Sequence, residues 1–140
     1  SIDQEKDHVS ESITQFLKKG QGKILVDNAQ TVVTCASVLD NLGWQDKAII
    51  CNQLVIKLLE EEVDTGHLIS AVAKHRIGAM LFKQGAYVDS LIPLEDSLKI
   101  RRSKLGDDHI ATEETLKMIS RAYAASGDSE MALFYFKEAM

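Results

Sequence analysis

The chain has 140 residues, of which 45% are hydrophobic and 26% are charged, a length and composition typical of one ordinary folded domain. The net charge of −5 argues against nucleic acid as the main partner, because phosphate binding needs clustered lysine and arginine. No apolar run approaches the length needed to cross a bilayer, so we expect no direct membrane insertion. The single proline and the 6% of aromatic residues favour helices over a β-sandwich or barrel.

Apolar residues at helical spacing predict an all-α chain of about seven helices. The first helix ends at Gly20, Asp27 or Asn28 caps the second, and Asp128 or Ser129 caps the last. In chain order, we expect helices at about 3–19, from that second cap to 41, and at 44–62, 67–84, 87–103, 109–125 and 129–140.

Three glycines recur every 42 residues and reveal an internal repeat. They are Gly43, Gly85 and Gly127, and each is expected to end a helix with a positive φ and to join two antiparallel helices. Small residues recur around them, so we expect close helix–helix contacts at these positions. The expected facing pairs are Ala36 with Ala48, Gly78 with Ser90, and Ser120 with Ala132. Each helix pair leaves an apolar face for the next pair to cover, as in a solenoid.

Side chains with catalytic or metal-binding chemistry are sparse, and we expect no catalytic residue, no metal and no cofactor. The four histidines lack carboxylates or cysteines at metal-ligand spacing, and His67 and His109, again 42 apart, are expected to cap or pack. No nucleophile stands with a general base. Cys35 and Cys51 fall on apolar helical positions and are interpreted as core thiols of an intracellular, cytoplasmic protein.

The third repeat resembles the tetratricopeptide repeat signature at nearly every defining position. Its residues are Leu116, Ile119, Ser120, Tyr123, Gly127, Ala132, Phe136 and Ala139. The 42-residue period and the connector 104–109 resemble the longer variety found in kinesin light chains. The resemblance divides 23–140 into repeats at about 23–64, 65–106 and 107–140, and leaves 1–22 as a cap or the remnant of a preceding repeat. The first repeat departs from the pattern at Asn52, which replaces an aromatic residue or leucine.

The resemblance implies a right-handed superhelical solenoid of antiparallel helix pairs, whose first helices line a concave groove that binds peptides or protein segments. Most of the groove positions are polar or basic in this chain, and such a surface should attract an acidic peptide, since arginine forms bidentate pairs with carboxylates. The subgroup that clamps chaperone C-termini needs lysine and asparagine where this chain has Val33 and Ser37, so that partner is not expected. The predicted partner-binding residues are Thr34, Ser37, Asn41, His75, Arg76, Lys83, Lys117 and Arg121, with Val33, Ala79 and Met118 beside them.

Three functional interpretations remain open. The first is a non-catalytic adaptor or scaffold that binds a partner protein in the groove. The second is a structural or oligomerisation segment of a longer array that associates through its end faces, because the last helix carries Leu133, Phe134, Phe136 and Met140 and such an apolar end can drive self-association. The third is a regulatory domain that holds a partner enzyme.

Overall fold

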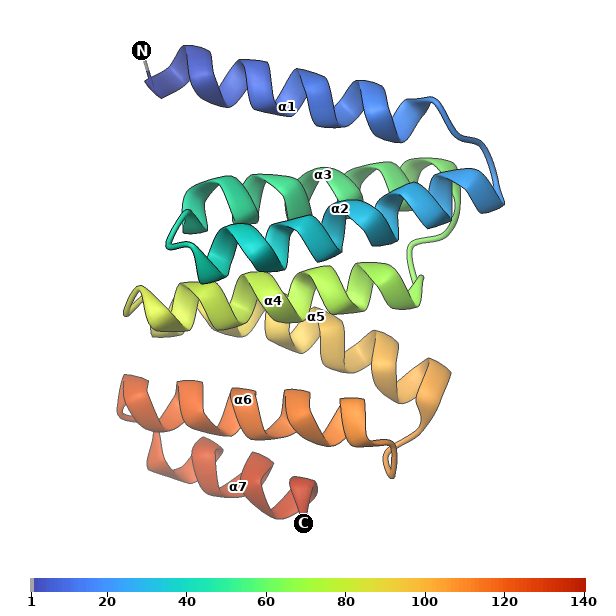
Figure 1. The fold of residues 1–140 in the computed structure, drawn as a ribbon. Helices are drawn as coiled ribbons and strands as arrows, with labels where there is room; N and C mark the ends of the chain where they lie inside the picture. The colour runs from blue at the N-terminus through green and yellow to red at the C-terminus, as the bar shows by residue number, and fades with distance from the viewer. Residues whose placement is uncertain (1) are drawn as a thin grey trace. The chain divides into compact units, whose positions relative to one another are not determined.

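The computed structural model describes the backbone of residues 2–140 and the side chains of residues 8–140. It contains seven α-helices and no strand in that part of the chain (Figure 1), so the predicted all-α helical-repeat class is confirmed. The helices are α1 (Ile2–Lys18), α2 (Lys23–Asn41), α3 (Gln45–Glu62), α4 (Leu68–Lys83), α5 (Tyr87–Leu105), α6 (Ile110–Ser126) and α7 (Ser129–Ala139).

The start of α2 is the one helix boundary that was predicted wrongly. The helix begins at Lys23, directly after Gly22, whose φ of 56° turns the chain out of α1. The predicted cap Asn28 lies inside the helix, where its Nδ2 donates to the backbone carbonyl of Phe16 in α1 at 3.3 Å. That contact explains why a residue with capping chemistry stands within a helix, because its side chain fastens α2 to its neighbour.

The repeated glycines act as predicted. Gly43, Gly85 and Gly127 have φ values of 86°, 81° and 96°. In each turn, the residue after the glycine donates its N–H to a carbonyl five residues earlier, the bond that closes a Schellman-type helix end. The three bonds are Trp44 to Leu39 at 2.8 Å, Ala86 to Leu81 at 2.9 Å, and Asp128 to Tyr123 at 2.9 Å. A Cβ would meet no neighbour at any of the three glycines, so backbone conformation and not space requires glycine there.

The other predicted caps are also present. The Nδ1 atoms of His67 and His109 each accept a hydrogen bond at 3.0 Å from the backbone N–H two residues on, at the starts of α4 and α6. Asp128 accepts from the N–H of Met131 at the start of α7. The 42-residue echo in the connectors therefore records a repeated helix start.

The chain forms two compact units, residues 1–73 and 74–140, with the division inside α4. In the first unit, α1 contacts both α2 and α3, and these two helices pack along each other (Figure 1). Buried apolar side chains, among them Leu17, Val33, Val55 and Leu59, fill its core. Ala36 and Ala48 are buried as expected of small contact residues.

Two polar residues of the first unit depart from the expected burial pattern. Cys35 is exposed, so its assignment to the core was wrong, whereas Cys51 is buried, and burial raises the pKa of the Cys51 thiol. Asn52 is fully buried, and its Nδ2 donates to the carbonyl of Ala48 at 3.1 Å. Its Oδ1 has no hydrogen-bond partner among the described residues. The residue that weakened the signature of the first repeat is therefore also an energetic defect of its core.

The second unit contains α4 from Lys74 onward and helices α5, α6 and α7. Its core consists of Leu94, Leu98, Leu116, Ile119, Ala122 and Ala139. Two predicted close contacts are confirmed here. A Cβ on Gly78 would lie 3.2 Å from the Ser90 carbonyl oxygen, and the Ser120 hydroxyl donates to the Ala132 carbonyl at 2.7 Å. Helix α6 thus packs on α5 with one face and on α7 with another.

Candidate partner-binding surface

On the first unit, the predicted partner-binding residues lie along α2. Thr34 and Asn41 are exposed, and Ser37 between them is half-buried. Thr34 donates its hydroxyl to the carbonyl of Gln30 at 2.9 Å and accepts from the Gln30 side chain at 3.4 Å. Val33, expected beside them, is instead fully buried in the core. The surface of α2 is therefore polar and uncharged at these three positions.

On the second unit, the predicted residues lie on α4 and α6. Lys83, Lys117 and Arg121 are exposed, and Arg76 is half-buried. The apolar residues expected beside them, Ala79 and Met118, are half-buried. Lys117 and Arg121 are four residues apart on α6 and therefore share one helix face. Neither of these two side chains forms an ion pair with any described residue.

Arg121 also links α6 to α4. Its guanidinium carbon lies 5.3 Å from the centre of the Phe82 ring, within cation–π range. Phe82 is itself held by an edge-on contact with Tyr87, with ring centroids 5.0 Å apart. The arginine is thus oriented by an aromatic ring and not by a carboxylate, and its donors remain available for an acidic ligand.

His75 was predicted on the same surface, and it is held between helices. Its Nδ1 lies 3.0 Å from the hydroxyl of Thr115 and 3.3 Å from Nη1 of Arg101. Because an arginine can only donate, Nδ1 must accept, and the ring proton is on Nε2. Burial, together with the charges of Arg101 and Arg76, lowers the pKa of His75 to about 4. The imidazole is therefore neutral at pH 7.

Arg101 was missed as a structural residue and was interpreted as one of several charges that suit a helix C-terminus. It is only 7% exposed. Its Nη1 donates to the hydroxyl of Thr115 at 2.7 Å and to the carbonyl of Ala111 at 3.1 Å, in addition to its contact with His75. Helical spacing held the signal, because Arg101 lies three and seven residues after Leu98 and Leu94 on the buried face of α5.

Burial lowers the pKa of Arg101, and the nearby carboxylate of Glu114 partly offsets this effect. The guanidinium remains charged at pH 7, because free arginine titrates above pH 12. The cluster of Arg101, His75 and Thr115 therefore places a fixed positive charge between α4, α5 and α6. This buried charge comes in addition to the exposed cations of α4 and α6 in a protein of net charge −5.

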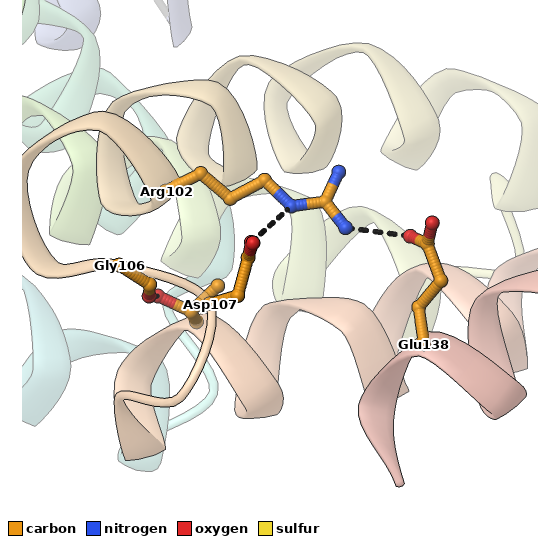
Figure 2. Close-up of polar contacts among 5 residues, drawn as sticks. Arg102, Gly106, Asp107 and Glu138 are labelled. Atoms are coloured by element: carbon orange, nitrogen blue, oxygen red, sulfur yellow. Dashed lines mark hydrogen bonds and ion pairs between the residues drawn. The ribbon is translucent and has the colours of Figure 1, made fainter.

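A second polar region joins α5 to α7. Arg102 donates through Nε to Asp107 at 3.0 Å and through Nη2 to Glu138 of α7, as Figure 2 shows. The hydrogen bond from Glu138 is the main cause of a raised pKa for Arg102. Beside these ion pairs is a hollow of about 540 Å³, lined by Glu95, Leu98, Lys99, Arg102, Ser103 and Tyr135. The sequence gave no signal for this hollow, because its walls come from helices about 40 residues apart.

Two other kinds of site were looked for in the described part of the chain. No group of three or more histidine, cysteine, aspartate or glutamate side chains there could hold a metal ion. Among the described residues, none of the helices has the length and hydropathy that a membrane span requires.

Comparison with known proteins gives one positive result. Residues 69–140, which cover α4 to α7 and slightly more than half of the chain, match the family described as tetratricopeptide repeat. A comparison with curated proteins found no match. The matched segment includes the repeated helix starts at His67 and His109 almost completely, and both later glycine turns. With its helix pairs, its repeated turns and this match, the chain belongs to the tetratricopeptide repeat family.

Proposed function

We propose that this chain is a non-catalytic protein-interaction module that binds an acidic segment of a partner protein. Membership of the tetratricopeptide repeat family supports protein binding in general. The acidic character of the partner rests on one observation: Lys117 and Arg121 lie on one face of α6 without carboxylate partners among the described residues. An adjacent pair of unneutralised cations favours carboxylates, and Arg121 presents a preoriented fork.

In this proposal, the partner contacts the neighbouring surfaces of α4 and α6 in the second unit. Arg121 pairs with a carboxylate while Phe82 beneath it offers apolar contact area, and Lys83 and Arg76 add positive charge. His75 serves by holding α4 against α6 through Thr115, since its ring is neutral and engaged. The exposed polar residues of α2, which are Thr34, Ser37 and Asn41, are proposed as further contacts of the partner.

Two finer features are proposed with it. The glycines at 42-residue spacing and the capping histidines of the connectors support a place in the longer variety of repeat that resembles kinesin light chains. The free thiols Cys35 and Cys51 support an intracellular, reducing location such as the cytoplasm.

The test is a selection of random dodecapeptides on the wild-type chain and on the Lys117→Glu/Arg121→Glu variant. The matched control is Lys57→Glu/Lys99→Glu, which changes the net charge equally but at exposed lysines of α3 and α5. We expect the wild type and the control to enrich acidic peptides, and binding to weaken as salt is added. Enrichment of neutral or basic peptides, or equal capture by the charge-reversed variant, would refute the proposal.

A second candidate function is interaction through the C-terminal helix. Leu133, Phe134, Phe136 and Met140 are all at least half-exposed on α7, which is more apolar surface than one short helix usually leaves in water. Self-association is one form of this function, and sedimentation of the purified chain measures it. A monomer at all concentrations would exclude that form and leave only binding of another protein.

A further inference from the structure

The internal repeat shows what normally covers the face that α7 leaves exposed. In α5, one face consists of Leu91, Leu94, Glu95 and Leu98, and helix α6 covers it. Leu94 and Leu98 are 0% and 5% exposed in the shared core. Glu95 accepts a hydrogen bond from the hydroxyl of Tyr123 on α6 at 2.9 Å.

The same face recurs on α7, 42 residues later, as Leu133, Phe136, Lys137 and Met140. There Leu133, Phe136 and Met140 are 52%, 51% and 86% exposed. We call these four residues the α7 stripe. Its apolar members repeat the positions and the character of the α5 residues that α6 buries, so the stripe has the shape of a helix-binding surface without its helix.

Phe134 provides an internal contrast. It is 53% exposed, almost the same as Phe136. Its repeat equivalent on α5 is Ile92, which stays 69% exposed because α6 does not cover that side. Exposure alone therefore does not separate the two phenylalanines, but the repeat does, and only Phe136 stands where a packed helix is expected.

The charge on the stripe differs from that of α5 in one place. Lys137 stands where α5 has Glu95. On α5, the carboxylate receives a proton donor, the Tyr123 hydroxyl, from the covering helix. On α7, an ammonium at that place instead requires an acceptor, and a carboxylate satisfies it best.

We propose that the α7 stripe binds an amphipathic α-helix of another protein, packed as α6 packs on α5. The helix carries apolar residues at the spacing of Leu116, Ile119 and Ala122, and an aspartate or glutamate at the place of Tyr123. The proposal deepens the second candidate function and rests on it, and it is independent of peptide binding at Lys117 and Arg121.

The same charge disfavours a second copy of this chain as the occupant. A symmetric dimer pairs a surface with itself about a two-fold axis. Lys137 lies near the middle of the stripe, so pairing two stripes brings two ammonium groups together at the axis, where like charges repel. A helix with a carboxylate at that place meets no such penalty.

The experiment uses the full chain and a peptide of known sequence. The probe is a fluorescent peptide of residues 110–126 that carries Tyr123→Glu, and the matched control peptide carries Tyr123→Lys. Binding is measured by fluorescence anisotropy against the wild type and the variants Phe136→Ser, Phe134→Ser and Lys137→Glu. All three substituted side chains are exposed, so folding is expected to persist, and circular dichroism checks it.

We expect the wild type to bind the Tyr123→Glu peptide at least about threefold more tightly than the Tyr123→Lys peptide, as for an exposed ion pair. The Lys137→Glu variant should reverse that order. Phe136→Ser should weaken binding by about tenfold or more, because a large apolar contact is lost. Phe134→Ser should change it less than about twofold.

Three results would each overturn the proposal. The first is no binding of the Tyr123→Glu peptide by the wild type, and the second is an equal loss with Phe134→Ser and Phe136→Ser. The third is a concentration-dependent dimer in sedimentation that Phe136→Ser abolishes, which would make a second copy the occupant. The Lys117→Glu/Arg121→Glu variant should bind the helical peptide like the wild type, so that failure here is distinct from failure of the acidic-segment proposal.

Discussion

Substitution of Gly78 by alanine tests the packing of α4 on α5 most directly. A Cβ placed on Gly78 would lie 2.5 Å from Cγ and 2.7 Å from Cδ2 of Leu94, and 3.2 Å from the carbonyl oxygen of Ser90. Carbon atoms pack best at about 3.5–4.0 Å, so the leucine must move by about 1 Å. Leu94 is fully buried in the core of the second unit, and it cannot move without disturbing that core.

Two opposing free energies decide the sign of the effect. Alanine is favoured over glycine inside a helix by about 1 kcal/mol, and overpacking a filled core costs about 1–3 kcal/mol or more. With a contact as short as 2.5 Å, we place the overpacking cost at the upper end of that range. The expected result is a net loss of stability of about 2 kcal/mol for Gly78→Ala.

Chemical denaturation followed by circular dichroism measures this loss, and a double-mutant cycle with Leu94→Ala identifies its cause. Leu94→Ala alone should cost about 2–5 kcal/mol by leaving a cavity. In that background, Gly78→Ala should become neutral or stabilising, because the clashing atoms are gone and part of the cavity is filled. A stabilisation of about 1 kcal/mol in both backgrounds would show that only helix propensity operates, and the packing argument would be refuted.

Two further predictions concern buried polar groups. Because the pKa of His75 is lowered to about 4 in the folded protein, the unfolded chain binds more protons below the ordinary value of about 6.5; stability should therefore fall by up to about 3 kcal/mol as the pH drops from 6.5 to 4. Denaturation across this range should show the effect in the wild type and not in His75→Asn, and parallel profiles would contradict it. Asn52→Leu should raise the free energy of unfolding by about 1 kcal/mol, because the unpartnered buried Oδ1 of Asn52 costs about 1–3 kcal/mol; a lower melting temperature would mean that the larger leucine does not fit.

Much of the candidate surface was predictable, because surface position on a helix follows from spacing. Lys83, Lys117 and Arg121 are exposed as predicted. His75 was placed on the same surface, but its hydrogen bonds to Thr115 and Arg101 hold it between helices. The spacing within α4 cannot show this, because the groups that engage the ring come from α5 and α6. Val33 was predicted at the surface for the same reason and is in the core.

The sequence by itself determined the helices, their repeat and their turns. A glycine at positive φ, a histidine or aspartate that caps a helix start, and an apolar period of 3.6 residues all act through neighbours within a few positions, so their effects can be read in order along the chain. Only the tertiary structure decided what each exposed or charged residue meets. Arg101 and Arg102 are adjacent, yet the first is buried against Thr115 and the second bridges Asp107 and Glu138. The direction in which each one points is set by the helices that pack around α5, and their distance along the chain hides them from any local pattern.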